Sequence, residues 1–172
     1  FIWSQPKTAI KDFRVVSTLN DTYKDGIFKL AIDLKKTNPG DRNITVKYDL
    51  LDSNGNTITS ESKDIAVKGN SLSTANFEYH IKDVSTWTSE HPNLYRLMMS
   101  VIDNGEIVEV VPFKVGFRKI EIKNSNIIVN KKPLRLFYVN GQPIKMKGTN
   151  IHETVEDGHY ITPEQMRRNF EL

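Results

Sequence analysis

Apolar residues recur at every second position in short runs between Ile10 and Val115, with polar residues between them. Successive side chains of a β-strand point to opposite faces, so this period predicts strands with one buried face. The two clearest runs contribute the expected inward-facing residues Phe28, Leu30, Ile32 and Leu34, and Ile44, Val46, Tyr48 and Leu50. No helical stripe of useful length interrupts the pattern, which indicates a mostly β fold.

Turn signals divide this region into seven strand-like runs, among them Asp52-Ser53-Asn54-Gly55 and Asp103-Asn104-Gly105. Seven short alternating strands predict an antiparallel β-sandwich of immunoglobulin or fibronectin-III type. The sequence contains no cysteine, so it lacks the disulfide of antibody domains. The core must therefore consist of aliphatic and aromatic side chains, and we expect Trp87 and Tyr95 to be buried in it.

The alternation changes phase at the end of this region. Val115 and Phe117 occupy odd positions, whereas Ile120 and Ile122 occupy even ones, so in an uninterrupted strand the two pairs would face opposite sides. A β-bulge between Phe117 and Ile120 would rotate the strand in this way. We therefore expect a domain boundary here, with residues 1–117 forming the sandwich and residues 118–172 a second unit.

The second unit contains a short internal repeat, because Val129–Leu136 is echoed ten residues later by Val139–Met146. Asn140-Gly141 tolerates positive φ at two successive positions and predicts a tight hairpin turn. A short strand is expected over 144–149. Near the end, Thr162-Pro163-Glu164-Gln165 predicts a capped helix start, with Met166 and Phe170 on one face.

The composition is that of an ordinary globular protein of 172 residues with a formal net charge of +3. No apolar run approaches the ~20 residues of a membrane span, so we expect no membrane contact. Nine basic residues and a single acid, Glu121, lie between Lys114 and Lys147. A nucleic-acid-binding β-domain would also present aromatic side chains for stacking there. Only Phe137 and Tyr138 lie close by, so a solvated basic surface is favoured and no nucleic acid is expected.

Three motifs, in order along the chain, resemble those of family 2 glycoside hydrolases, the β-galactosidase and β-glucuronidase group. The first is a W-x-x-E-x-P-N-L-Y signature from Trp87 to Tyr95, and the second is Gly116-Phe117-Arg118. The third is an N-G-x-P-I hairpin from Asn140, followed by N-x-H-E over 150–153. The resemblance implies that residues 118–172 are the N-terminal start of a (β/α)8 catalytic barrel, truncated within its first helix.

The same resemblance implies the activity of a longer enzyme, a retaining hydrolase that cleaves terminal non-reducing β-D-galactosides. Its two catalytic glutamates lie on later barrel strands, so we expect this chain to be an inactive internal piece with no catalytic residue. Its partners would be the remaining domains of the same polypeptide. No cofactor is expected here; a divalent cation and an oligomeric assembly are left open for the full-length enzyme, as are its compartment and its choice among galactose, glucuronate and mannose.

Sites in such barrels form at the carboxyl ends of the strands. If 144–149 is the first strand, Asn150, His152 and Glu153 lie at the substrate rim, and the resemblance gives His152 a substrate-contacting role. Glu153 is not expected to be catalytic, because the family's carboxylate pair comes from later strands.

A metal site in the same segment is disfavoured. His152, Glu153, Glu156, Asp157 and His159 do not have the H-E-x-x-H spacing of a helical zinc site, and Gly158 argues against a helix there.

An alternative hypothesis is a stand-alone β-sandwich that serves as a binding or adhesion module for carbohydrate or protein. Such a module has no reason to end in a barrel-entry strand and a capped helix. It would also be expected to present a row of exposed aromatic residues. Trp87 could serve as a sugar-stacking platform, but closing one end of the sandwich is the favoured role for its indole.

Overall fold

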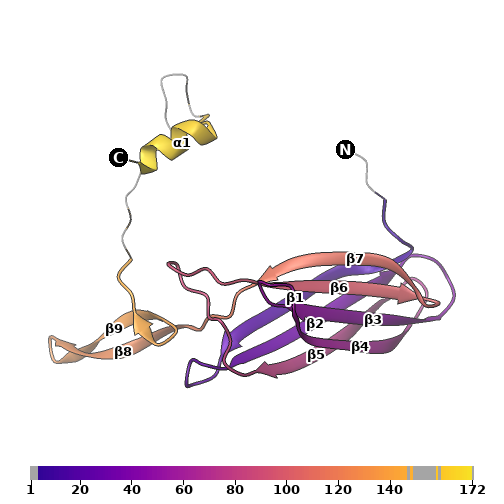
Figure 1. Cartoon of the computed structure of the whole chain (residues 1–172), viewed down its shortest axis with the longest axis horizontal. Helices are drawn as coiled ribbons and strands as arrows, with labels where there is room; N and C mark the ends of the chain where they lie inside the picture. The colour runs from indigo at the N-terminus through magenta and orange to yellow at the C-terminus, as the bar shows by residue number, and fades with distance from the viewer. Residues whose placement is uncertain (1–3, 147, 149–157, 159, 172) are drawn as a thin grey trace.

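A computed structural model describes residues 4–146, 148, 158 and 160–171 of the chain. Two antiparallel sheets form a β-sandwich (Figure 1). Three strands in the order β1-β2-β5 make the first sheet: β1 (Thr8–Leu19), β2 (Gly26–Lys36) and β5 (Leu72–Ile81). Four strands in the order β4-β3-β6-β7 make the second: β3 (Arg42–Leu51), β4 (Thr57–Val67), β6 (Tyr95–Asp103) and β7 (Glu106–Val115). The predicted sandwich is confirmed.

The core lies between the two sheets and is built from the side chains that the alternation predicted. All eight inward-facing residues expected on β2 and β3 are at most 1% exposed. Tyr48 is central, with ring centroids 5.4 Å from Phe28 and 5.0 Å from Phe77. The alternation on β2 continues to Lys36, which is also buried. The Lys36 ammonium donates to the carbonyl oxygens of Asn38 and Pro39 and to the Asn38 side chain, which compensates its burial.

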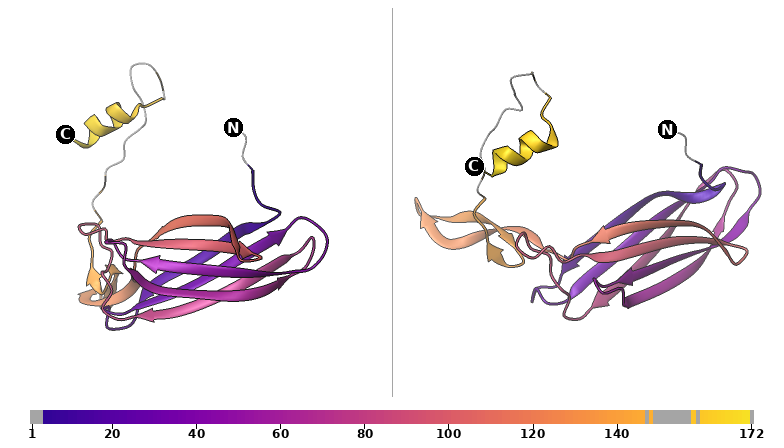
Figure 2. Two further views of the ribbon diagram at one scale, coloured as in Figure 1. Left: turned by 45° about the vertical axis from the view of Figure 1, so that its right-hand side comes forward. Right: turned by 45° about the horizontal axis from the view of Figure 1, so that its top comes forward.

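A small third sheet projects from one end of the sandwich, as Figure 2 shows from two sides. It consists of β8 (Ile120–Val129), β9 (Lys132–Val139) and the very short β10 (Gln142–Pro143). We call it the hairpin sheet. Its two turns, Asn130-Lys131 and Asn140-Gly141, have positive φ at both central residues, as type I′ turns require. The predicted repeat is thus two successive hairpin turns of the same type.

The sequence predicted a β-bulge at the end of the sandwich, but the structure shows a different cause for the phase change. β7 ends at Val115, and the chain passes through residues 116–119 outside any strand before β8 begins. Phe117 points into the core and is 0% exposed, whereas Ile120 is 48% exposed. A break is found in place of a bulge because the backbone here bonds to neighbouring loops: the Phe117 carbonyl accepts from the Trp87 N–H at 2.9 Å.

The expected strand from Ile144 is not found in the part of 144–149 that the structure describes. Residues 144–146 and 148 have no strand assignment, and β10 ends at Pro143. A parallel barrel strand needs neighbours on both edges to hydrogen-bond its backbone. Ile144 keeps one backbone hydrogen bond to β9, from its N–H to the Phe137 carbonyl at 2.9 Å. In the described part of the segment no second strand continues this pairing, which explains the difference.

The helix α1 (Pro163–Phe170) begins as predicted. Thr162 and Gln165 form a reciprocal capping box, with Pro163 in the first turn. None of its residues is buried, and Phe170 is 83% exposed. Within the described ranges, no helix has the length and apolar character to cross a membrane.

Candidate functional site where three motifs meet

The Gly116-Phe117-Arg118 motif leaves the sandwich beneath Trp87. A Cβ on Gly116 would lie 3.1 Å from the Trp87 Cβ, so a larger residue would crowd the indole. Phe117 packs edge-on against Tyr95, with ring centroids 5.2 Å apart. The Arg118 guanidinium lies 4.5 Å from the centre of the Trp87 ring, in cation–π geometry. Each residue of the motif thus contacts an aromatic residue of the Trp87–Tyr95 signature.

The loop from Trp87 to Tyr95 is held by its own hydrogen bonds. The Thr88 N–H donates to the His91 carbonyl at 3.0 Å, and the Asn93 side chain donates to the Thr86 carbonyl at 3.0 Å. The Tyr95 hydroxyl accepts from the Ser85 N–H at 2.9 Å. Tyr95 is buried, as predicted, at 7% exposure. Trp87 is only half-buried, so the expectation that it is buried like Tyr95 is wrong.

The third motif reaches the same place through Asn140. The Asn140 side-chain NH₂ donates to the Trp87 carbonyl at 3.0 Å, and its Oδ1 accepts from the Lys119 N–H at 2.9 Å. The Asn140 N–H in turn donates to the Lys119 carbonyl at 2.9 Å. The turn residue therefore joins the Trp87 loop to the connection that follows Arg118. Three motifs that are separate in the sequence meet at one end of the sandwich.

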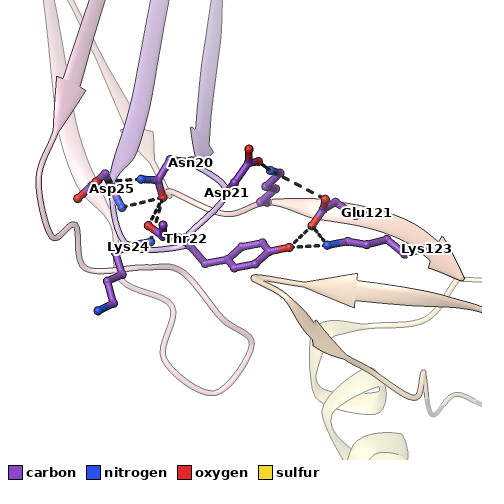
Figure 3. A network of polar contacts seen from close by, with 9 residues as sticks. Asn20, Asp21, Thr22, Lys24, Asp25, Glu121 and Lys123 are labelled. Atoms are coloured by element: carbon purple, nitrogen blue, oxygen red, sulfur yellow. Dashed lines mark hydrogen bonds and ion pairs between the residues drawn. The ribbon is translucent and has the colours of Figure 1, made fainter. Parts of the chain in front are cut away.

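A cluster of polar side chains beside the turn was not expected from the sequence (Figure 3). The Tyr23 hydroxyl, from the β1–β2 loop, donates to Glu121 Oε2 at 2.9 Å and accepts from the Lys123 ammonium. Lys123 also pairs with Glu121 at 2.9 Å, and Lys119 pairs with Asp21 at 2.7 Å. The β1–β2 loop and β8 are thereby linked. The only sequence signal was an aromatic residue within a polar turn.

These contacts shift the proton affinities of the cluster. The hydrogen bond from Lys123 lowers the pKa of Glu121 below its usual 4.5, and the hydrogen bond from Tyr23 contributes a smaller lowering. The hydrogen bonds of Lys123 with Tyr23 and then Glu121 raise the pKa of its ammonium. Lys119 likewise lowers the pKa of Asp21, and Asp21 raises that of Lys119. The charged forms are therefore favoured at neutral pH.

A cleft of about 610 Å³ opens between the Trp87 loop and the hairpin sheet. Trp87, Glu90 and Arg118 line one side, and Phe137, Asn140 and Met146 line the other. Apolar side chains such as Ile120 and Phe137 contribute most of its lining, and its charged residues are Glu90, Arg118 and Lys145. Arg118 covers part of the indole ring, which supports a packing role for Trp87 over a sugar-stacking one.

The substrate-contacting residues expected from the sequence, Asn150, His152 and Glu153, lie outside the described residues, so their placement stays a prediction. The same holds for Glu156, Asp157 and His159 of the disfavoured metal cluster. In the part of the chain that the structure describes, no group of three or more His, Asp or Glu side chains is placed to hold a metal ion.

Comparison with known proteins gives the family. The profile described as "Glycosyl hydrolases family 2" matches residues 8–118. A β-galactosidase from Streptococcus thermophilus is 36% identical over 168 residues, and one from Priestia megaterium (strain DSM 319 / IMG 1521) is 32% identical over 170. Each alignment covers 96% of this chain, but only 14% and 16% of the respective relative. The chain thus spans a small part of the length of these relatives.

Solved structures show the same fold. A glycosyl hydrolase family 2 member from Bacteroides cellulosilyticus DSM 14838 superposes with a TM-score of 0.78 at 15% identity, over 97% of this chain and 22% of that one. The β-glucuronidase 2 of Bacteroides uniformis gives 0.78 at 17% identity, over 97% and 20%. The chain belongs to glycoside hydrolase family 2.

The cluster should give the chain a specific dependence on acid. Since the pKa of Glu121 is lowered by folding, its stabilising contribution is complete above about pH 4.5 and is lost as the pH falls through the lower folded value. We expect the urea midpoint to fall between neutral pH and pH ~3.5 more steeply in the parent chain than in Glu121→Gln. Trp87 fluorescence in a Trp3→Phe background reports this transition. Equal slopes would show that Glu121 does not contribute.

Proposed function

We propose that the longer polypeptide to which this chain corresponds is a retaining glycoside hydrolase of terminal non-reducing β-D-galactosides. The chain would supply the sandwich, residues 1–117, and the start of the catalytic barrel, residues 118–172. The observation that carries this proposal is the meeting of the three motifs: Arg118 stacks on Trp87, and Asn140 bonds to the Trp87 carbonyl. The family and the names of the β-galactosidase relatives support the same reaction.

The role of the chain in that enzyme would be structural. Six large apolar side chains of the hairpin sheet are 40% to 63% exposed: Ile120, Ile122, Ile127, Ile128, Val129 and Leu134. A concentration of exposed apolar side chains on one element is typical of an interaction site. We therefore assign this surface to contact with the remaining domains of the same polypeptide.

The residues proposed to reach substrate follow the hairpin sheet in the sequence. Asn150, His152 and Glu153 match the family's N-x-H-E motif, and His152 is the proposed hydrogen-bonding partner of a sugar hydroxyl. A neutral imidazole can both donate and accept, which suits it to a substrate hydroxyl. A retaining mechanism also needs two carboxylates about 5 to 5.5 Å apart, which later barrel strands would supply.

The 172-residue chain alone should not hydrolyse nitrophenyl β-galactoside. The family's two catalytic glutamates come from later barrel strands, and a positioned histidine alone cannot supply the nucleophile of a double displacement. The measurement is nitrophenol release by the purified chain, with Glu153→Gln as the control. Turnover that this substitution abolishes would contradict the proposal and make Glu153 catalytic.

The substrate itself is tested on the longer polypeptide. We expect its kcat/KM for nitrophenyl β-galactoside to exceed that for the corresponding β-glucuronide. The opposite order would assign the chain to a glucuronidase and leave the glycosidase class intact. Tight, saturable binding of a β-galactoside to the 172-residue chain alone would favour a sandwich that is a carbohydrate-binding module.

A further inference from the structure

We propose that Tyr23 and the Asn140-Gly141 turn form a fixed joint that sets the orientation of the hairpin sheet relative to the sandwich. This inference goes beyond the proposed function and does not depend on it. Residues 116–119 connect the two parts, and a connection of this kind ordinarily allows relative motion unless an interface prevents it. The contacts around the turn supply such an interface.

The first contact is steric. The Tyr23 ring lies against Gly141 so closely that a Cβ at Gly141 would come within 2.6 Å of the Tyr23 Cε2 and 2.9 Å of its Cζ. Real Cβ atoms do not approach other atoms to 2.6 Å, so any side chain at Gly141 would displace the ring. The Tyr23 ring can lie in this position only if residue 141 is a glycine.

The internal repeat shows that backbone conformation alone does not require this glycine. The equivalent residue of the first turn is Lys131, which adopts a φ of 62° compared with 77° at Gly141. A lysine therefore occupies the same position of the same turn type at the far end of the hairpin. The difference between the two turns is the Tyr23 ring, and this contact explains the glycine at 141.

The second contact is polar and is made by Asn140, the other central residue of the turn. Asn140 makes three hydrogen bonds: two to the Lys119 backbone in the connection, and one across the joint to the Trp87 carbonyl of the sandwich. The turn is thereby held between Tyr23 of the β1–β2 loop and Trp87 of the β5–β6 loop. Both loops belong to the sandwich, so the turn is fixed at two separate points of it.

Tyr23 is itself held in place at both ends. At its hydroxyl it bonds to Glu121 and Lys123, and both the Lys119 and Lys123 ammonium groups lie within 5.5 Å of its ring centre. At its backbone, the N–H donates to the Asn20 carbonyl at 3.1 Å. The Asn20 side chain organises the rest of the loop through Thr22, Lys24 and Asp25 (Figure 3). A rigid loop presents the ring, which is what a positioning residue requires.

The joint can be tested by measuring orientation. The chain has no cysteine, so Ser62→Cys on β4 and Lys132→Cys at the start of β9 allow two spin labels to be attached specifically. Both positions are exposed. Pulsed dipolar spectroscopy then gives the distribution of label distances. We expect a narrow distribution in the labelled parent and a roughly twofold broader one in Gly141→Ala, as for parts free to move.

A matched control separates the ring contact from backbone strain. Gly105 lies in the Asn104-Gly105 turn of the β6–β7 hairpin with a φ of 81°, and a Cβ there would have no described atom within 4 Å. Gly105→Ala should leave the distance distribution unchanged although it strains the backbone similarly. Equal broadening in both variants, or none in Gly141→Ala, would overturn the proposal.

A second pair tests the polar side and covers the case in which Gly141→Ala does not fold. Asn140→Ala should broaden the distribution, whereas Asn104→Ala should not, because among the described residues no hydrogen bond of the Asn104 side chain is found. Near-UV circular dichroism would check that the sandwich stays folded in each variant. A narrow distribution in Asn140→Ala would show that this residue has only the role of a turn former.

Discussion

Replacing Phe117 by alanine should lower the free energy of unfolding of the chain by about 3 to 5 kcal/mol, the range for a buried aromatic residue. Its side chain is 0% exposed and packs edge-on against Tyr95. It also lies 2.9 Å from where a Cβ on Gly26 would be, which shows how tightly this end of the core is filled. The cavity that the alanine leaves cannot close unless these neighbours move, so most of the lost packing is not recovered.

The matched control is Phe113 on β7, which is 44% exposed and makes an edge-on contact with Phe13. Phe113→Ala removes the same atoms from a site that water already reaches, so it should cost less than about half as much. Urea unfolding of the two variants, followed by circular dichroism, gives the comparison. Similar losses for both would mean that the Phe117 end of the sandwich is not part of the cooperative core.

In the longer enzyme, His152→Ala should reduce kcat by about 30- to 1000-fold, the equivalent of about 2 to 4 kcal/mol of transition-state stabilisation. The proposed contact between His152 and a sugar hydroxyl would strengthen as the ring distorts. A contact of that kind affects turnover more than affinity. The measurement is kcat and KM on nitrophenyl β-galactoside, together with the thermal midpoint.

His80→Ala is the matched control, because His80 is an exposed histidine on β5 that pairs only loosely with Glu78, at 3.4 Å. It should leave both kcat and the thermal midpoint unchanged. A wild-type kcat in His152→Ala, or a loss that follows the thermal midpoint, would show that His152 is an ordinary loop residue and that the proposed substrate rim is wrongly placed.

The sandwich could be predicted from the sequence because its determinants are local. The alternation on β2 and β3 identified the buried face residue by residue, and the Thr162 capping box identified the start of α1. Both features repeat a short-range rule, the two-residue period of a strand and the three-residue spacing of a cap. Such rules hold wherever one face of an element is buried or one helix end is exposed.

The end of the sandwich where the three motifs meet could be predicted only in part. The motifs were recognised, but the half-burial of Trp87 depends on the Arg118 stack and on the neighbouring cleft, neither of which has a sequence period. Tyr23 was missed because its partners Glu121 and Gly141 are far away in the chain. The expected strand from Ile144 depended on neighbouring strands that the described residues do not include.

The hairpin sheet has one turn fixed in the joint and one turn, Asn130-Lys131, at the tip far from it. If residues are added in facing pairs, one on each strand next to the tip, the register of the existing pairs does not change. The side chains of β8 and β9 between the insertion and the joint therefore keep their faces. The length of β8 and β9 can therefore change at the tip without disturbing the contacts of Tyr23 and Asn140. In the 172-residue chain by itself, the tip is accordingly the place where a fluorescent reporter can be inserted while the joint is retained.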